Sequence, residues 1–381
     1  MKDIRGVHFM SYAHFIANDE GKVDVSRMES QGGHYKGHFP MGLIGGFKPA
    51  SSEFKYARFF KRDVETPNEV KVSVHEGHLS EEDLCPPDPA PHLAWVTHLR
   101  HYMAPGVKRI PVRYGKVRGT LFLPQGPGPF PGVVDMFGGT GGLLEYRSAQ
   151  LASRGFASLA LAFFGYDDLP KSLEEFNITY FEEAVEFLLK HEKILKPNVG
   201  TIGISKGGDL ALSLATYIPE VKAAVWINGC NANVQSTLQL HHGKLPGLKY
   251  DISKLQVVDG VFDTCEALLN PEDYPETIIP IEKADANFLF LVGLVDRNWK
   301  SELYADLAIK RLQQAGRDNY EVHKYEGTGH LIECPYSPYA HTTYHSVTRA
   351  PVVFGGTMVP HLQAQLQIWN TLRKFLTRFI R

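Results

Sequence analysis

Residues 199–218 read VGTIGISKGGDLALSLATYI and carry the strongest local pattern in the chain. The apolar run before Ser205 predicts a buried strand, and the residues after it predict a helix. Gly203, Ser205 and Gly207 join the two in the pattern G-x-S-x-G. Between a strand and a helix, this pattern is typical of a nucleophile elbow, a strained turn that lifts a serine hydroxyl above the edge of a sheet. The alternative is a plain glycine-rich turn whose serine only caps the helix.

Strand patterns and helical patterns alternate on both sides of this stretch. Further strands are expected at 131–137, 156–163, 221–229, 287–296 and 320–326. Helices are expected at 148–155, 172–191, 301–316 and 361–380. Strands that are buried on both faces and alternate with helices specify a parallel sheet covered by helices. Together with the elbow, this predicts an α/β fold, and specifically an α/β-hydrolase catalytic domain over residues 111–381.

The residues before this domain show a different pattern. Short apolar stretches alternate with turn signals over residues 7–75, and Val70, Val72 and Val74 recur at a period of two. This is typical of antiparallel strands in a β-sandwich. A chain of 381 residues is also too long for one hydrophobic core to organise. We therefore expect a smaller antiparallel β-sandwich domain over residues 1–110.

A serine nucleophile needs a histidine as base and a carboxylate that orients the histidine. In α/β-hydrolases the acid follows the serine along the chain, and the histidine follows the acid. Asp296 directly follows the apolar run 288–295, and His330 lies in a loop just after the strand 320–326. Both are therefore expected at the carboxyl edge of the sheet, where ligands bind. The predicted catalytic triad is Ser205, Asp296 and His330.

Other residues compete for the roles of acid and base. The competing acids do not directly follow a buried strand, and one competing histidine, His323, falls inside a strand pattern. The competitors are Asp259, Asp263 and Asp285 for the acid, and His323, His341 and His345 for the base. A helix cap at Asp296 and a surface loop at His330 are the purely structural interpretations.

An oxyanion hole needs two donors beside the nucleophile. The backbone N–H of Lys206 directly follows Ser205, and the second donor is expected in the glycine-rich loop 137–142. We favour Phe137 or Gly138 for this role. A flexible surface turn is the alternative for the loop, and a phosphate-binding loop is excluded because no G-K-[ST] ending follows it.

Residues 231–285 are too many for a plain connection and are rich in proline, glycine and charge. We expect this segment to form a cap over the pocket. A disordered excursion is the alternative, because long loops without structure of their own are often disordered.

Composition argues against several other classes of protein. Lys and Arg number 40 and Asp and Glu number 42, a formal net charge of −2, so no basic field recruits nucleic acid or a membrane surface. No apolar run approaches the length of a membrane span. The adjacent pair His241-His242 has no acidic residue at ligand spacing beside it, so neither a metal nor a cofactor is expected. The four cysteines form no C-x-x-C pair and are expected to be reduced thiols: Cys85, Cys230, Cys265 and Cys334.

Many stretches of this sequence resemble the family of the type I acyl-CoA thioesterases and the bile acid-CoA:amino acid N-acyltransferases. They span nearly the whole chain and include KRDVETP (61–67), PGPFPGVVDMFG (127–138), YFEEAVEFLL (180–189), GISKGGDLALSLA (203–215), INGCNANV (227–234), FLFLVG (288–293) and GTGHLIE (327–333). The resemblance implies a β-sandwich followed by an α/β-hydrolase domain, and a triad that maps onto Ser205, Asp296 and His330. It also implies a fatty acyl-CoA substrate.

The nucleophile divides two activities within this family. The amino acid-conjugating enzymes characteristically carry cysteine at the elbow, whereas this chain has Ser205. An acyl-serine ester hydrolyses readily, whereas an acyl-cysteine thioester suits capture by an amine such as glycine or taurine. Serine therefore favours hydrolysis to a free fatty acid and coenzyme A. The alternatives are an amino acid N-acyltransferase with the same triad, a non-catalytic acyl-CoA-binding member, and a generic carboxylesterase or peptidase.

Three further expectations follow from the sequence and this resemblance. The chain begins where the family's second sandwich strand is expected, so the sandwich is expected to lack its first strand. The sequence shows no secretory signal, no transit signal and no peroxisomal C-terminal signal. A cytoplasmic location is therefore expected. The resemblance leaves peroxisomal and mitochondrial locations open. Lys206, Arg297 and Lys300 are nearby cations for coenzyme A phosphates, although solvated surface is the commoner environment of such residues.

Overall fold

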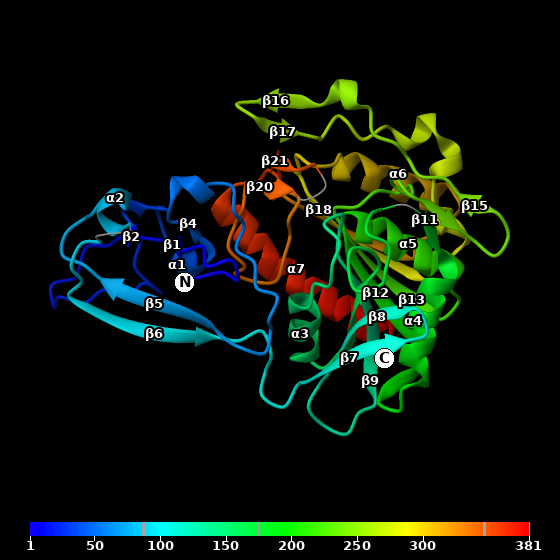
Figure 1. Cartoon of the computed structure of the whole chain (residues 1–381), viewed down its shortest axis with the longest axis horizontal. Helices are drawn as coiled ribbons and strands as arrows, with labels where there is room; N and C mark the ends of the chain where they lie inside the picture. Colours follow the sequence, from blue (N-terminus) through cyan, green and yellow to red (C-terminus); the bar gives the residue numbers. More distant parts are fainter. Residues whose placement is uncertain (86–88, 174, 346–347, 381) are drawn as a thin grey trace.

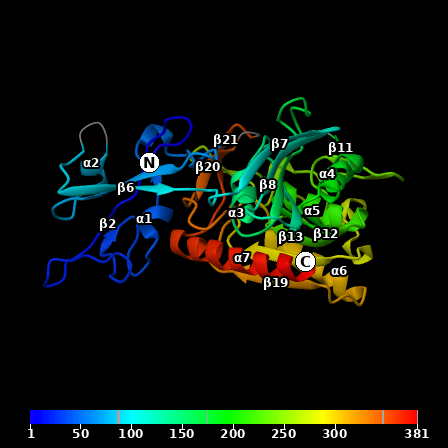
Figure 2. The same ribbon diagram turned by 90° about the horizontal axis from the view of Figure 1, so that it is seen from below.

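A computed structural model describes residues 1–85, 89–173, 175–345 and 348–380. A smaller N-terminal part lies beside a larger α/β part in both views (Figure 1, Figure 2). In the described residues, the larger part holds an eight-stranded sheet in the order β19-β18-β13-β12-β9-β10-β8-β7. Its strands are β7 (Lys108–Tyr114), β8 (Val117–Leu123), β9 (Phe130–Met136), β10 (Ala157–Ala162), β12 (Ile194–Ile204), β13 (Val221–Ile227), β18 (Asn287–Gly293) and β19 (Tyr320–Tyr325).

This sheet is parallel except at one edge. β8 pairs antiparallel with β7 and β10, and the other neighbouring strands pair parallel. The central strands β9, β10 and β13 are buried along almost their whole length, which agrees with their largely apolar sequences. The predicted α/β fold with a helix-covered, mostly parallel sheet is confirmed. Ser205 follows β12 and Asp296 follows β18 closely, so both lie at the carboxyl edge.

Helices cover both faces of the sheet. On one face, α4 (Ile178–Lys190), α5 (Lys206–Tyr217) and α6 (Ser301–Gln314) share an apolar core with the strands. On the other face, α3 (Tyr146–Ala152) and α7 (Met358–Phe379) share a second core. Successive side chains of a strand point to opposite faces, and accordingly Val134 belongs to the first core and Val133 to the second.

One predicted helix starts later than expected. The prediction covered 172–191, which includes residue 174 outside the described residues, and α4 begins only at Ile178. Asn177 caps the helix, because its side chain accepts a hydrogen bond from the N–H of Thr179. Residues Glu175–Asn177 form the short strand β11 instead.

In its described residues, the N-terminal part contains three two-stranded antiparallel pairs and a small apolar core. The strands are β1 (Phe9–Met10) with β4 (Lys48–Pro49), β2 (Ala13–His14) with β3 (Gly32–Gly33), and β5 (Asn68–Val74) with β6 (Ala94–Arg100). The short helices here are α1 (Gly42–Gly45), η1 (Ser52–Phe54) and α2 (Glu81–Leu84). Antiparallel pairing was predicted, but in the described residues the pairs do not join into two extended sheets, because four of the six strands have only two residues.

The three valines that recur at a period of two lie in strand β5, as predicted, but they differ in burial. Val70 of β5 is 1% exposed and packs in the small core, whereas Val72 and Val74 are 37% and 57% exposed. The predicted boundary at residue 110 falls inside β7, which belongs to the large sheet.

Residues 231–285 are folded, which speaks against a disordered excursion. The segment contains β14 (Thr237–Gln239), β15 (Lys244–Leu245), β16 (Gln256–Val258), β17 (Val261–Asp263) and the 3₁₀ turns η2 (Ile252–Lys254), η3 (Pro271–Asp273), η4 (Pro275–Thr277) and η5 (Ile281–Lys283). β17 pairs with β21 (Ala350–Val353), which in turn pairs with β20 (Thr342–His345). Figure 1 shows β16 and β17 at the outer edge of the molecule, above β20 and β21. None of the described helices is long and apolar enough to cross a membrane.

Candidate active site

Ser205 lies on the turn between β12 and α5 with φ 57° and ψ −128°. A residue with a side chain is held in this left-handed region only by its surroundings. The flanking glycines permit the turn: a Cβ on Gly203 would collide with the Gly207 carbonyl, and a Cβ on Gly207 would collide with the carbonyl of Phe137. The Ser205 side chain makes no capping hydrogen bond to α5, so the alternative of a plain capping serine is wrong.

Asp296 and His330 meet next to this turn. His330 Nδ1 lies 2.7 Å from Asp296 Oδ2, and both side chains are about 2% exposed. The Ser301 hydroxyl donates to the same Oδ2 at 2.6 Å, and the N–H groups of Asn298 and Trp299 donate to Oδ1 at 2.8 and 3.0 Å. An ionised carboxylate can only accept, so Nδ1 carries the ring proton and Nε2 is left as the acceptor. This is the tautomer that a general base requires.

Ser205 and His330 line one hollow of about 430 Å³. The hollow also contains the loop that was predicted to supply the second oxyanion donor. A Cβ built on Gly138 would lie 2.9 Å from Ser205 Cβ, so the backbone of that loop passes directly beside the nucleophile. The lining residues are Arg58, Phe137, Gly138, Gly139, Thr140, Ile204, Ser205, Asn298, His330, Leu331, Thr343, Tyr344, His345 and Phe354.

This lining bears on the predicted cap. The described lining includes no residue of the segment 231–285, whereas three residues of β20, Thr343, Tyr344 and His345, do line the hollow. The segment reaches the hollow only indirectly, because β17 pairs with β21 and β21 pairs with β20. A cap formed by 231–285 over Ser205 therefore stays a prediction.

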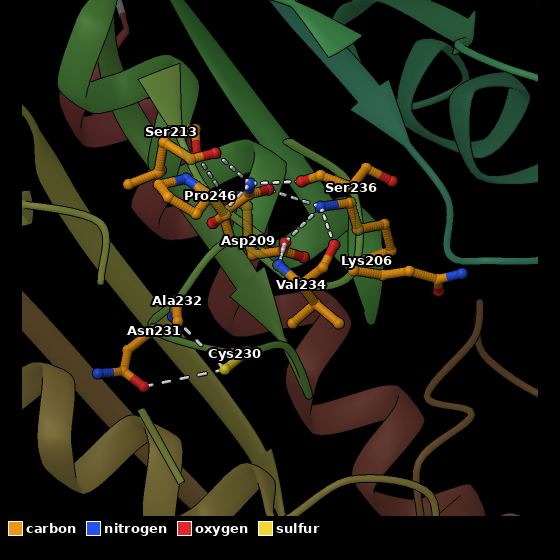
Figure 3. Close-up of polar contacts among 12 residues, drawn as sticks. Lys206, Asp209, Ser213, Cys230, Asn231, Ala232, Val234, Ser236 and Pro246 are labelled. Carbon is orange, nitrogen blue, oxygen red and sulfur yellow. Dashed lines mark hydrogen bonds and ion pairs between the residues drawn. The ribbon is translucent and has the colours of Figure 1, made fainter. Parts of the chain in front are cut away.

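The side chain of Lys206 is enclosed behind the elbow. Its Nζ donates to Asp209 Oδ2, Asn233 Oδ1 and the Val234 carbonyl, each at 2.8 Å, and the side chain is 2% exposed. Asp209 Oδ2 also accepts from the N–H of Val234 at 2.9 Å. Figure 3 shows Lys206 and Asp209 of α5 next to Val234 of the segment 231–285. Burial raises the pKa of Asp209 to about 6 although Lys206 opposes this shift.

The three cations considered for coenzyme A phosphates differ in their availability. Lys206 is sealed from the hollow by its own hydrogen bonds, so the expectation of a solvated or phosphate-binding Lys206 side chain is wrong. Arg297 pairs with Asp263 at 2.6 Å and is 46% exposed. Lys300 lies 3.4 Å from Glu266 and is 22% exposed.

The competing acids serve other contacts. Asp263 holds Arg297, as described above, and Asp285 pairs with Lys222 at 2.7 Å on the surface. Asp259 lies in the turn between β16 and β17 with φ 50°. Among these carboxylates, His330 contacts only that of Asp296.

Two of the competing histidines do not line the hollow that contains Ser205. His323 is partly exposed on β19 and lies 3.9 Å from Glu321, and His341 contacts the Thr342 hydroxyl at 2.9 Å. His345 is different, because it lines the same hollow as Ser205. Burial, followed by the nearby charge of His330, lowers the pKa of His345 to about 4. His345 is therefore a neutral imidazole in the wall of the hollow at physiological pH.

Asn228 is a site residue that the sequence analysis missed. It directly follows β13, has φ 43° and is fully buried. Its Oδ1 accepts from the N–H of Gly293 at 2.8 Å, and its Nδ2 donates to the carbonyls of Gly329 and His330 at 3.0 and 2.9 Å. One side chain thus connects the end of β18, which Asp296 follows, to the loop that carries His330.

The backbone beside Asn228 completes this connection. The carbonyl of Ile227 accepts from the N–H of Ser205 at 3.0 Å. Hydrogen bonds therefore connect the carboxyl ends of β12, β13 and β18 next to Ser205 and His330. The reasoning that selected Asp296 also applied to Asn228, because each is a polar residue that directly follows an apolar strand pattern.

The strand order, the strained serine turn and the buried His–Asp pair together define the α/β-hydrolase class, with an N-terminal domain attached. The chain belongs to the acyl-CoA thioester hydrolase/BAAT family. A family model described as the acyl-CoA thioester hydrolase/BAAT N-terminal region matches residues 1–114. A second, described as the BAAT/acyl-CoA thioester hydrolase C terminal, matches residues 176–381.

Curated relatives agree over the full length. The chain is 44% identical to human acyl-coenzyme A thioesterase 1 over 383 aligned positions, which cover 100% of this chain and 89% of the relative. It is 44% identical to human mitochondrial acyl-coenzyme A thioesterase 2, covering 100% and 77%. Mouse acyl-coenzyme A thioesterase 5 is also 44% identical, covering 100% and 89%. Among solved structures, Pyrococcus horikoshii acylaminoacyl peptidase matches with TM-score 0.49 and 14% identity, covering 72% of this chain and 42% of that chain.

Proposed function

We propose that the protein hydrolyses fatty acyl-CoA to a free fatty acid and coenzyme A, with Ser205 as nucleophile. The observation that carries this proposal is the strained Ser205 turn in one hollow with His330, whose Nδ1 is fixed on Asp296 at 2.7 Å. The family membership and the thioesterase names of the relatives support the substrate class.

The reaction divides into acylation and deacylation. His330 Nε2 takes the Ser205 proton as Ser205 Oγ attacks the thioester carbonyl, while Asp296 stabilises the resulting imidazolium. The backbone N–H of Lys206 and one N–H from the Phe137–Gly138 loop hold the oxyanion. The thiolate of coenzyme A leaves with the proton from His330. A water activated by His330 then attacks the acyl-serine ester, which releases the fatty acid and regenerates Ser205.

Ser205 distinguishes hydrolysis from amide formation. The ester that Ser205 forms is attacked readily by water, and the amine acceptors of the conjugating members are not required. Transfer of the acyl group to glycine or taurine by the same triad is the competing reaction, and the identity of the acyl product distinguishes the two. No metal or cofactor takes part in the proposed reaction, and the cytoplasm is the proposed location.

The test is thiol release from a panel of saturated acyl-CoAs with and without glycine or taurine, followed by mass spectrometry of the acyl product. Free fatty acid in every case supports the thioesterase. An amide that forms only with added amine would assign the protein to the N-acyltransferases. Absence of both thiol release and labelling of folded protein by a fluorophosphonate would support a non-catalytic protein.

A further inference from the structure

The lining of the hollow includes a residue from the N-terminal part. Arg58 lies between η1 and β5, far in sequence from the elbow, yet lines the same hollow as Ser205 and His330. We propose that Arg58 binds the pantetheine arm of the substrate by donating a hydrogen bond to the amide carbonyl nearest the thioester. This inference rests on the proposed acyl-CoA substrate.

The guanidinium of Arg58 is held firmly in this position. Its Nη1 donates to Glu333 Oε1 at 2.6 Å, and the Tyr146 hydroxyl donates to the same oxygen at 2.7 Å. The guanidinium carbon lies 5.8 Å from the ring centre of Phe137, a residue of the same hollow. The Arg58 and Glu333 side chains are only 12% and 10% exposed. Arg58 is therefore preorganised and needs little ordering when substrate binds.

Arg58 has more donors than its contact with Glu333 requires. A guanidinium has five N–H groups in a planar fork, and the contact with Glu333 engages Nη1. Arg58 lines the hollow and its side chain is partly exposed, so the guanidinium borders the space beside Ser205.

The charge environment selects a neutral acceptor. Burial disfavours the charge of Arg58, but Glu333 and Tyr146 outweigh this effect and raise its pKa. The Glu333 carboxylate also neutralises the guanidinium locally. A compensated arginine attracts a phosphate less than a free one but still makes charge-assisted hydrogen bonds to a carbonyl. An amide carbonyl therefore fits this position better than a phosphate does.

A neighbouring apolar hollow leaves the other side for the acyl chain. A second, smaller hollow shares Phe137 and Gly138 with the first. Its remaining lining is Gly141, Gly142, Leu144, Leu161, Phe163 and Phe164, with no charged side chain. A fatty acyl chain has no acceptor for Arg58 and gains by burial against such residues. The amide-containing arm is the part of the substrate left for the Arg58 wall.

The experiment compares three thioesters that carry the same acyl chain. The acyl-CoA has the amide and the phosphates, the N-acetylcysteamine thioester has only the amide, and the ethanethiol thioester has neither. In Arg58→Met we expect kcat/KM to fall about tenfold or more for the first two, mainly through KM, and to change by less than about twofold for the third. The ratio between substrates is the readout, so a smaller folded fraction cancels out.

Two further variants complete the design. Arg109→Met removes an arginine that also pairs with a carboxylate, Glu145 at 2.8 Å, but does not line the hollow, and all three rates should stay near wild type. Arg58→Lys keeps a cation beside Glu333 and covers the case in which the methionine variant folds poorly. Because lysine lacks the planar fork, kcat/KM should again fall for the two amide-containing thioesters and not for the ethanethiol thioester.

A loss of kcat/KM confined to acyl-CoA would indicate a phosphate contact and overturn the inference. Equal losses on all three substrates, or no loss on any of them, would also overturn it. Failure of the wild type to cleave any acyl-CoA would instead refute the proposed function.

Discussion

Asp296 accepts four hydrogen bonds, which use both of its oxygens and come from Asn298 and Trp299 of its own loop, from Ser301 at the start of α6, and from His330. Three of these bonds fix the carboxylate so that the fourth sets the orientation of the imidazole. The carboxylate thus acts through geometry as much as through charge. Its position could be predicted from sequence because an acid directly after an apolar strand emerges at the carboxyl edge.

Asp296→Asn tests this role. The amide cannot accept the Nδ1 proton as the carboxylate does, so the histidine loses its required tautomer. We expect kcat to fall by about 10³–10⁴-fold, a loss known for the equivalent substitution in other triads. Steady-state thiol release measures this. Asp285→Asn changes a surface carboxylate that pairs with Lys222 and should leave kcat within about twofold; a similar kcat in the two variants would remove Asp296 from the triad.

Asn228→Ala tests the connection between the acid-bearing strand and the histidine loop. The change removes three hydrogen bonds and leaves the buried carbonyls of Gly329 and His330 without this donor. We expect a fall in kcat of about tenfold to a hundredfold with little change in KM, because a small displacement of the base is costly. Stopped assays at saturating substrate together with thermal melting separate activity from stability.

The matched control is Asn319→Ala. Asn319 donates to the Ala286 carbonyl at the opposite end of β18 and β19, and its loss should lower the melting temperature without lowering kcat. Equal kcat in Asn228→Ala and wild type would show that the histidine loop does not need Asn228.

At the scale of elements, α5 combines two functions. Its first N–H is the proposed oxyanion donor, and the side chain of the same residue anchors the segment 231–285 through Asn233 and Val234 (Figure 3). The apolar strands and the elbow were predictable because periodicity and glycine spacing are local properties. The later start of α4 depends on the Asn177 cap and on pairing of β11 with β14, and that pairing is not local.

Lys206→Met tests the buried ion pair. It leaves the Asp209 carboxylate buried without its cation, so we expect about 3–5 kcal/mol of destabilisation at pH 8. Burial already raises the pKa of Asp209 to about 6, and loss of Lys206 raises it further. An aspartate whose pKa is higher in the folded state than its ordinary value of 3.8 stabilises the folded state fully below pH 3.8. This stabilisation is lost as the pH rises through the pKa of the folded state.

The loss in Lys206→Met should therefore be smaller at pH 5, where Asp209 is protonated, than at pH 8. Urea unfolding at both pH values measures the difference. The double variant Lys206→Met/Asp209→Asn should recover most of the stability at pH 8. A destabilisation that does not depend on pH would contradict the account of this pair.

At the scale of the whole molecule, the two parts of the chain meet at the active site. Arg58 reaches the hollow from the N-terminal part, and Glu333, which holds it, follows His330 closely. The parallel sheet and the meeting of Ser205, Asp296 and His330 could be predicted, because chain order and sheet edge constrain them. The Arg58–Glu333 contact joins residues 275 positions apart and has no sequence pattern of its own. Likewise, the valine pattern of β5 predicted a strand but not which valines become buried, because burial depends on neighbouring elements.

The central claim is that Ser205 is the nucleophile of an acyl-CoA hydrolase. The most direct test compares thiol release from acyl-CoA by the wild type and by Ser205→Ala, with thermal melting to show that both are folded. We expect the wild type to release thiol and free fatty acid, and the variant to lose at least about 10⁴-fold in kcat. A variant whose activity stays within about tenfold of the wild type would contradict the account.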